Sequence, residues 1–344
     1  MQALVTEPGR ASSARVEELP EPAPQRGEVA VRVLEVGVCG TDREIAHGHF
    51  GVAPDGESTL VIGHELLGTV DRDGEGFSRG DHVAAIVRRS CGRCLACAED
   101  SPDSCLTGDY LERGITRLDG FARELVAESA SQLIPVPRTL GRLGVLGEPT
   151  SICTRALRHA RAIGGRQPWQ LQRALVLGAG AIGLLTTILL RLDGVEVWTA
   201  SLEPENDLVG AVGGSYVSTG DAQLSELGRF DLVVEAAGDA QLMTNALSLL
   251  RRGGVACILG IDGREQTVRL EGRVIGVDTV LENRVLFGSV NAHRRDWLAG
   301  VAALDQARER WQDVLESLIV LRVPLDRFAE AFDGGPGKTT LVLA

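Results

Sequence analysis

The chain has 344 residues, 44% of them hydrophobic, and a formal net charge of -12. That length suggests about two domains, and the composition excludes a disordered chain. The negative charge disfavours a nucleic-acid partner and means that any bound nucleotide must be held by local backbone dipoles. The first residues lack the basic and apolar regions of a secretory signal, so we expect a cytoplasmic protein with reduced cysteines.

The first part of the chain predicts β-structure and carries three possible zinc ligands. Residues 2–38 alternate between apolar and polar side chains, which is typical of antiparallel strands. Cys39 follows this segment, and His64 and Glu65 precede another β pattern at residues 67–70. Zinc accepts thiolate, imidazole and carboxylate ligands when one position stays open for substrate. Each residue also has an ordinary explanation, because buried cysteines are usually inert and His-Glu pairs occur on surfaces.

Four cysteines lie close together further along the chain. They are Cys91, Cys94, Cys97 and Cys105. Four thiolates at this spacing can form a closed tetrahedral site, which is the form of a structural zinc and not of a catalytic one. Free thiols or two disulfides are the alternatives, and a reducing compartment disfavours the disulfides. We expect a structural zinc in a lobe of about residues 88–110.

A glycine turn at residues 178–183 follows a buried strand pattern and precedes an apolar helix pattern. Its G-x-G-x-x-G spacing suits a dinucleotide, because the glycines allow a tight turn, a close pyrophosphate and close packing of helix on strand. The helix start also offers free N–H groups to phosphate. A tight turn without a ligand is the alternative. The residues expected to contact the cofactor are Gly178, Gly180, Ala181, Ile182 and Gly183.

From residue 170 onward strands and helices alternate, which predicts a doubly wound α/β sheet. The expected strands are residues 175–177, 196–200, 231–238, 254–260, 287–291 and 340–343, and the expected helices are 240–250, 294–318 and 323–332. The uncharged run at residues 174–190 is shorter than the ~20 residues that a membrane span needs. The Gly-Lys-Thr sequence at 337–339 fails the spacing of a phosphate loop.

Together these motifs resemble the zinc-dependent medium-chain dehydrogenase/reductase superfamily over the whole chain. The motifs that carry the resemblance are Gly37-x-Cys39-Gly-Thr41-Asp42, Gly63-His64-Glu65, the four-cysteine lobe, Glu148-Pro149, the glycine turn and Phe230-Asp231-x-x-x-Glu235-Ala-x-Gly238. Residues 39–45, 112–115, 148–149 and 288–292 look like those of the microbial glucose (aldose) 1-dehydrogenases.

The resemblance implies a fold class of α/β with two domains. Residues 156–292 would form the doubly wound Rossmann cofactor domain. Residues 1–155 and 293–344 would form a mainly β, partly open barrel-like (GroES-like) catalytic domain that contains the structural zinc lobe.

The resemblance also implies roles for individual residues. Cys39, His64, Glu65 and Glu148 would bind a catalytic zinc, with Glu65 or Glu148 exchanging with water during turnover. Thr41 would relay the substrate proton. The residues implied for the sugar pocket are Glu112, Glu148 and Asn291, and Ala237 and Asn291 are implied for the cofactor. Alternatively, Glu112 forms an ion pair with Arg113, and Asn291 caps a loop.

Two positions depart from the glucose dehydrogenase pattern. NADP enzymes of that family usually have arginines after the second Rossmann strand, whereas residues 200–204 here read Ala-Ser-Leu-Glu-Pro. Glu203 lies twenty residues after Gly183, near the usual place of the acid that binds the ribose hydroxyls, although Ser201 aligns more naturally with it. We therefore expect NAD to be preferred over NADP. Ile152 offers no hydrogen bond to a sugar hydroxyl where a polar residue is expected, which weakens the case for glucose itself.

We expect an enzyme with two zinc ions per chain that transfers a hydride from an aldose such as glucose, or from a related polyhydroxylated alcohol, to NAD(P). A polyol, cyclitol or secondary-alcohol dehydrogenase is the alternative within the same class. A redox-neutral enzyme or a ligand sensor that keeps the fold is the alternative from another class. The family resemblance implies a homodimer or homotetramer, and residues 270–290 are the expected interface.

Overall fold

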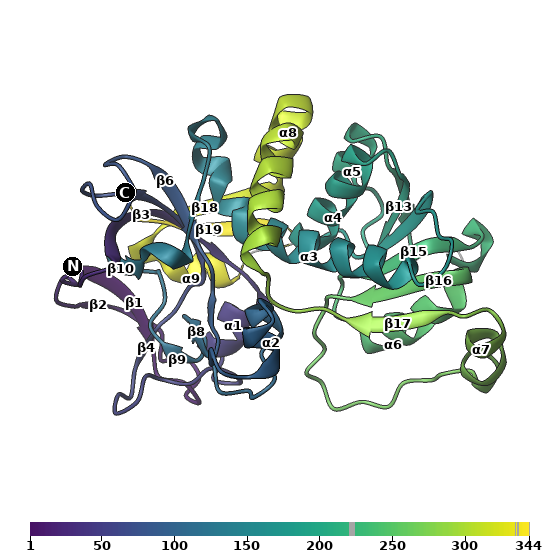
Figure 1. Ribbon diagram of the computed structural model, residues 1–344, viewed down its shortest axis with the longest axis horizontal. Helices are drawn as coiled ribbons and strands as arrows, with labels where there is room; N and C mark the ends of the chain where they lie inside the picture. The colour runs from purple at the N-terminus through teal and green to yellow at the C-terminus, as the bar shows by residue number, and fades with distance from the viewer. Residues whose placement is uncertain (220–223, 334, 336, 344) are drawn as a thin grey trace. The chain divides into compact units, whose positions relative to one another are not determined.

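The computed structural model describes residues 1–219, 224–333, 335 and 337–343 (Figure 1). The chain forms two compact units. The first unit contains Met1–Ser151, Asn291–Asp305 and Ile319–Ala344, and the second contains Ile152–Val290 and Gln306–Leu318. The domain boundaries given by the resemblance place residues 306–318 in the first unit, and they stay a prediction.

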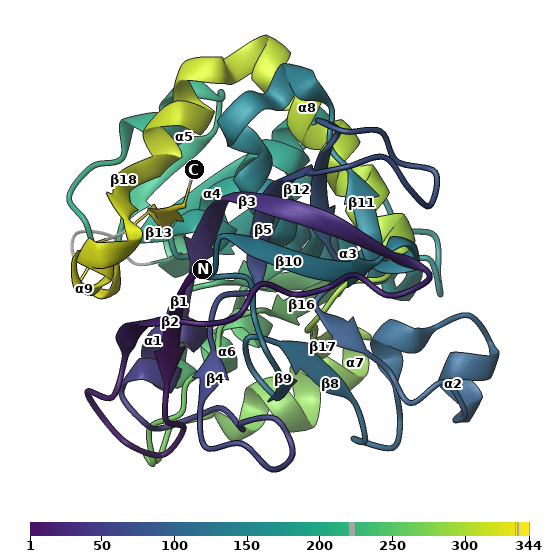
Figure 2. The ribbon, with the colours of Figure 1, turned by 90° about the vertical axis from the view of Figure 1, so that its left-hand side faces the viewer.

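The first unit is mainly β-structure (Figure 2). Its largest sheet has seven strands in the open order β11-β6-β5-β3-β19-β18, with β10 also paired to β3. Its strands are β3 (Glu28–Val38), β5 (Glu65–Val70), β6 (His82–Ala85), β10 (Leu125–Ser129), β11 (Leu133–Pro135), β18 (Ile319–Pro324) and β19 (Lys338–Val342). Neighbours are antiparallel except β18 and β19. Alternation along β3 places Val29, Val31 and Val33 in the core, as a period of two requires.

Two small sheets and several short helices complete the first unit. The sheets have the orders β2-β1-β4 and β7-β8-β9. Their strands are β1 (Gln2–Thr6), β2 (Arg15–Glu18), β4 (Leu60–Val61), β7 (Arg88–Arg89), β8 (Leu111–Arg113) and β9 (Arg117–Leu118). The α-helices confined to this unit are α1 (Gly40–Ala46), α2 (Leu95–Ala98) and α9 (Phe328–Phe332).

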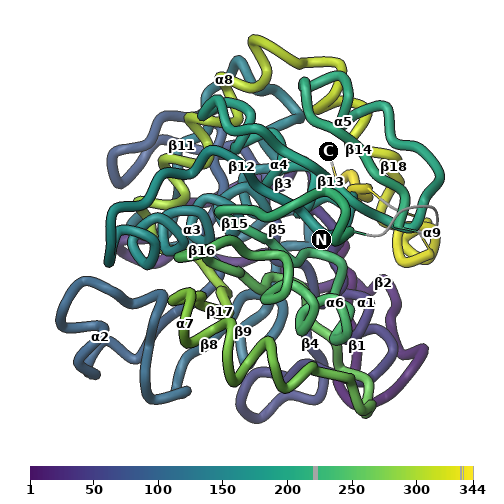
Figure 3. The backbone as a smooth tube through the Cα atoms, turned by 90° about the vertical axis from the view of Figure 1, so that its right-hand side faces the viewer, coloured from purple at the N-terminus to yellow at the C-terminus, as the bar shows by residue number. Residues whose placement is uncertain are grey.

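The second unit is a six-stranded parallel sheet in the order β14-β13-β12-β15-β16-β17 (Figure 3). Its strands are β12 (Arg173–Leu177), β13 (Glu196–Ser201), β14 (Ser215–Ser218), β15 (Phe230–Glu235), β16 (Leu250–Ile258) and β17 (Val285–Gly288). The strand order reverses between β12 and β15, where a doubly wound sheet binds its ligand. Together with the mainly β first unit, this sheet confirms the expected fold class.

Helices flank the parallel sheet, with α4 (Ala181–Leu192) and α5 (Asp207–Ala211) on one side and α6 (Ala240–Asn245) on the other (Figure 1, Figure 3). Helix α7 (Thr279–Leu281) is short, while α3 (Gly147–Gly164) and α8 (Arg294–Leu318) run from one unit into the other. Among the residues that the structure describes, no helix combines the length and apolar character needed to cross a bilayer.

Two predicted helices have different bounds in the structure, and one strand was not predicted. The helix expected at residues 323–332 begins later, because 323–324 close strand β18 and a 3-10 turn precedes α9. The helix expected at 240–250 ends as α6 at Asn245 and continues as a 3-10 turn. Strand β14 was not expected, because its four residues Ser-Tyr-Val-Ser give too short a pattern to distinguish from a loop.

Candidate functional site

Cys39, His64 and Glu65 come together in the first unit. Each offers one ligand atom, and these atoms all lie within 4.8 Å of one another. Cys39 follows strand β3 directly and is the N-cap of α1, where its Sγ accepts the backbone N–H of Thr41 at 3.1 Å. His64 Nε2 lies 3.3 Å from Cys39 Sγ. Pairing of β3 with β5 puts Glu65 opposite Gly37, so antiparallel register brings the carboxylate beside the cysteine.

Asp42 lies beside the imidazole of His64 as an ion-pair partner, although Asp42 Oδ1 and His64 Nδ1 do not form a hydrogen bond of normal geometry. Its Oδ2 accepts the backbone N–H of Cys39 at 2.9 Å, and its Oδ1 lies 3.2 Å from His64 Nδ1. Nε2 is therefore the nitrogen that faces the sulfur, in the arrangement by which carboxylates commonly orient metal-binding histidines. Burial disfavours the charged imidazolium, but Asp42 and Cys39 outweigh that effect and raise the pKa of His64 well above its usual value. No role for Asp42 was expected, although its N3 position in a capping box places it beside Cys39.

Glu65 is held by Lys338, a residue for which no role was expected. Lys338 Nζ donates to Glu65 Oε1 at 2.6 Å, and both side chains are buried. The other oxygen, Glu65 Oε2, is also buried and has no hydrogen-bond partner in the described part of the chain. Gly37 leaves it room, since a Cβ at this position would lie 1.9 Å from Oε2. A buried, unpartnered carboxylate oxygen beside a thiol and an imidazole fits a cation, because leaving it unpaired is costly.

Glu148, in the first turn of α3, belongs to the same electrostatic environment but is not one of the three residues whose ligand atoms cluster. Its side chain is buried. Burial and the nearby Glu65 carboxylate raise the pKa of Glu148 to about 7, against the opposing effects of His64 and Lys338. A carboxyl that is half-protonated near neutral pH is suited to ligand exchange, because a bound cation would displace its proton. As zinc ligands, all four residues remain predictions.

The four-cysteine lobe has the geometry of a closed metal site. Its four sulfurs lie within 4.8 Å of one another, with separations of 3.5 Å between Cys94 and Cys97, 3.9 Å between Cys91 and Cys97 and 4.0 Å between Cys94 and Cys105. Zinc–sulfur bonds of about 2.3 Å place neighbouring sulfurs of a tetrahedron about 3.8 Å apart. All seven cysteines are free thiols, so the lobe is not closed by disulfides.

The predicted sugar residues Glu112 and Asn291 lie near this lobe. Glu112 Oε1 accepts from Arg88 at 2.9 Å, so its partner is Arg88 and not the neighbouring Arg113. Asp103, in the lobe, offers its carbonyl to Arg88 Nη1 at 3.1 Å and to Asn291 Nδ2 at 3.4 Å. Asn291 has a left-handed backbone with φ of 68°. The Asp103 carbonyl therefore contacts Asn291 directly and Glu112 only through Arg88.

Arg113, the alternative partner considered for Glu112, lies in a different ion pair. Its Nε donates to Glu128 Oε2 at 2.9 Å, and the same oxygen accepts from Arg89 at 2.6 Å. Glu128 is buried, so the two guanidinium groups together compensate its charge. Arg113 therefore compensates the buried charge of Glu128, and the ion-pair partner of Glu112 is Arg88.

The glycine turn of the second unit has the shape of a nucleotide cradle. Gly178 follows β12 directly with a φ of 105°, and a Cβ there would lie 2.8 Å from Ala237 N. A Cβ at Gly183 would lie 1.9 Å from Gly178 O, so the first turn of α4 packs directly on the loop. By contrast, a Cβ at Gly180 would meet nothing within 4 Å. That open space beside the free N–H groups of a helix start fits a pyrophosphate.

The remaining predicted cofactor residues lie at the carboxyl ends of strands in the same sheet. Ser201 ends β13, and its hydroxyl donates to the Glu203 carboxylate. Ala237 follows β15, where its N–H donates to Glu235 Oε1 at 2.9 Å. The structure thus brings the glycine turn and these strand ends to one edge, the edge at which doubly wound sheets bind nucleotides.

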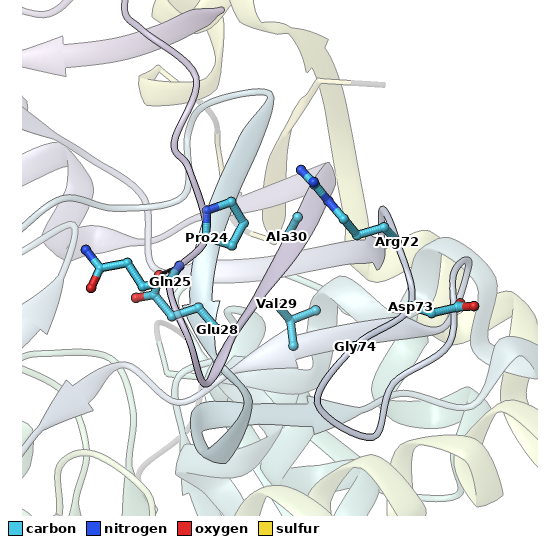
Figure 4. Close-up of a pocket in the computed structure, with 8 residues that line it drawn as sticks. All are labelled: Pro24, Gln25, Glu28, Val29, Ala30, Arg72, Asp73 and Gly74. Atoms are coloured by element: carbon cyan, nitrogen blue, oxygen red, sulfur yellow. Dashed lines mark hydrogen bonds between the residues drawn. The ribbon is translucent and has the colours of Figure 1, made fainter.

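A shallow pocket of about 170 Å³ lies elsewhere in the first unit (Figure 4). Its lining residues are Pro24, Gln25, Glu28, Val29, Ala30, Arg72, Asp73 and Gly74. It contains none of the predicted site residues and is smaller than the ~300 Å³ at which small-molecule sites begin. This pocket is therefore not the candidate site.

Two family models match the chain. The model described as glucose dehydrogenase C-terminus matches residues 141–344, and the alcohol dehydrogenase GroES-like domain model matches residues 25–138. Glucose 1-dehydrogenase of Methanocella arvoryzae is 39% identical, with 97% of this chain and 96% of the relative covered. Glucose 1-dehydrogenase of Thermoproteus tenax is 38% identical, with 96% of each chain covered.

Solved structures give the same result. The glucose dehydrogenase of Haloferax mediterranei in complex with NADP, Zn and gluconolactone matches with a TM-score of 0.92 and 30% identity, covering 100% of this chain and 99% of that one. Galactitol-1-phosphate dehydrogenase from Escherichia coli matches with a TM-score of 0.82 at 22% identity, over 99% of this chain and 100% of that one. The second likeness shows the fold alone.

Proposed function

The chain belongs to the zinc-dependent medium-chain dehydrogenase/reductase superfamily and, within it, to the glucose dehydrogenase family, and on that basis we propose that it oxidises an aldose such as glucose at the C1 hydroxyl with NAD(P). The observation that carries the proposal is the donor set of half-buried Cys39 and buried His64 and Glu65, in a chain that is similar to glucose 1-dehydrogenases over nearly its whole length.

Cys39, His64, Glu65 and Glu148 would hold the catalytic zinc, and Cys91, Cys94, Cys97 and Cys105 would hold a structural zinc, giving two per chain. When bound, zinc acidifies a coordinated sugar hydroxyl and NAD(P) accepts the hydride from C1.

The chain's own residues would position the substrate and move its proton. Asp42 is the ion-pair partner of His64, and Lys338 compensates the charge of Glu65. Thr41 would relay the proton of the C1 hydroxyl to solvent by accepting it while passing on its own, so that C1 becomes the carbonyl of a lactone once the hydride has left. Glu112 and Asn291 would hydrogen-bond other sugar hydroxyls, in which case Arg88 and Asp103 fix their side chains.

NAD is the proposed preferred cofactor. Glu203 carries a carboxylate two residues after the end of β13, and the Ser201 hydroxyl lowers its pKa. An ionised carboxylate there can accept hydrogen bonds from the ribose hydroxyls of NAD, whereas it would repel the 2′-phosphate of NADP. The Haloferax mediterranei relative was solved with NADP, so this preference would be a difference between the two proteins.

A homodimer or homotetramer is the proposed assembly. Strand β17 is at the edge of the parallel sheet, and Val280, Leu281 and Leu286 are exposed on or beside it. An unpaired edge strand with exposed apolar side chains is a common surface for pairing with a second copy. Mass measurement in solution tests the assembly, and a monomer at micromolar concentration would contradict it. The cytoplasmic location stays a prediction.

A polyol, cyclitol or secondary-alcohol dehydrogenase is the second candidate, because of Ile152. This residue follows Glu148 by one turn of α3 and offers no hydrogen bond to a substrate hydroxyl. A panel of aldoses, polyols and cyclitols, run with both cofactors and followed by cofactor absorbance, separates the two candidates. Turnover of an aldose supports the main proposal, and turnover of polyols alone supports the second. Product formation without reduced cofactor would instead indicate a redox-neutral enzyme.

A further inference from the structure

Tyr216 is the residue that holds the candidate ribose-binding carboxylate in place. We infer that Tyr216 is a positioning residue for cofactor specificity, which fixes the turn from Ser201 to Glu203 so that the Glu203 carboxylate is presented to the ribose hydroxyls of NAD. This inference rests on the NAD preference proposed above and assigns it to a hydroxyl group from a different strand.

The contacts come from the parallel pairing of β13 and β14. In that register Thr199 lies opposite Tyr216 and Ser201 lies opposite Ser218. The phenol of Tyr216 thereby extends past the end of β13. Its Oη donates to the Glu203 carbonyl at 2.6 Å and lies 2.7 Å from Ser201 Oγ.

Ser201 connects these contacts to the carboxylate. Its hydroxyl donates to Glu203 Oε2, so the side chain and the backbone of Glu203 are both held. Thr219, the residue after β14, adds a second contact, because its N–H and its hydroxyl both donate to Ser201 O, at 2.8 and 3.1 Å. Hydrogen bonds from Tyr216 and Thr219 therefore hold the turn on both sides of Leu202, which is itself exposed.

A fixed carboxylate binds a ribose diol better than a mobile one. Because the turn already loses its conformational entropy when the protein folds, ordering it does not reduce the free energy gained on cofactor binding. Hydrogen bonding by Ser201 lowers the pKa of Glu203, so the group is an anion at neutral pH. A mobile turn would move that anion away from a 2′-phosphate and reduce the discrimination against NADP.

Tyr216→Phe tests the inference, because it removes the hydroxyl and keeps the ring. Binding of NADH and NADPH to the full-length protein is measured by ligand fluorescence, which does not depend on turnover. We expect the Kd for NADH to rise about tenfold, at the upper end of the effect of one hydrogen bond, while the Kd for NADPH changes less than twofold. At saturating NAD, kcat should stay within twofold of the wild-type value. Tyr110→Phe is the matched control, since Tyr110 is the other of the two tyrosines and stacks against Arg88 in the first unit.

The outcomes separate this inference from the proposed NAD preference. Wild-type protein that binds NADPH more tightly than NADH contradicts the preference itself. Wild-type protein that prefers NADH, with a Tyr216→Phe variant whose ratio of the two Kd values is unchanged, contradicts only the role of Tyr216. Equal weakening of both cofactors would show a merely structural role. If Tyr216→Phe does not fold, Ser201→Ala removes the hydrogen bond to the Glu203 carboxylate itself and must lower the preference in the same direction.

Discussion

Lys338 and Glu65 form a buried ion pair of 2.6 Å between the start of β19 and the start of β5. Burial lowers the pKa of Lys338, but the Glu65 carboxylate outweighs it and raises that pKa above its usual value. The ammonium group is thus charged and is the main compensation for Glu65 in the absence of a metal. The pair connects the last strand of the chain to a predicted zinc ligand.

Lys338→Met should destabilise the metal-free protein by about 3–5 kcal/mol, because it leaves the Glu65 carboxylate buried without a partner. Urea denaturation of the chelator-treated protein measures this loss. In zinc-loaded protein the loss should be smaller, since the cation supplies the missing positive charge. Lys338→Arg, which keeps the charge, is the control. Equal losses with and without zinc would argue against a cation beside Glu65.

Gly37→Ala should displace the Glu65 carboxylate, since the added Cβ would lie 1.9 Å from Oε2. We expect one zinc per chain in place of two, with kcat/KM reduced at least about 100-fold, as is common when a catalytic group is misplaced by 1 Å. Metal analysis and kinetics give the two readouts. Gly210→Ala is the matched control, because a Cβ there meets nothing within 4 Å. Two zinc ions retained in Gly37→Ala would refute the assignment.

Glu148 should make the metal-free protein less stable as pH rises from about 4.5 to 7. Its pKa is raised to about 7 from the ordinary 4.5, so between these values the folded protein holds a proton that the unfolded chain has released. Stability falls with pH wherever the folded state binds more protons. Denaturation at several pH values, compared with Glu148→Gln, isolates this contribution. A wild-type curve parallel to that of Glu148→Gln would show that Glu148 titrates normally.

Cys94→Ser and Cys39→Ser should each lose one zinc but differ in their effects on Tm and turnover. Cys94→Ser opens the four-cysteine site, so we expect loss of one zinc and a Tm lower by several degrees, with residual turnover in the protein that remains folded. Cys39→Ser should also lose one zinc but abolish turnover at nearly unchanged Tm. Zinc content, Tm and kcat are measured for both variants. Abolished turnover at unchanged Tm in Cys94→Ser would reverse the two assignments.

Much of the fold and site follows from the sequence, where the interacting residues are near one another along the chain. The sulfurs of Cys91, Cys94 and Cys97 can meet whatever the rest of the molecule does, because a short loop limits how far apart they can lie. The glycine turn is similar, since Gly178 and Gly183 pack on each other across five residues. Alternation and apolar runs likewise predict both kinds of sheet, because burial of one or both faces dictates the period.

Only the tertiary structure decided which distant residues surround these motifs. Lys338 meets Glu65 across 273 positions, Glu112 is held by Arg88 across 24, and Tyr216 reaches Ser201 across 15. Each of these contacts depends on which strands are neighbours and in which register they pair, and a shift of one residue would turn the side chain to the other face. The residues of one strand do not by themselves determine its register with a strand far away in the chain. The sequence by itself therefore determined which metal-binding and nucleotide-binding residues the chain carries. Strand pairing decided which distant residues contact them, and those contacts set the charge and the position of each side chain.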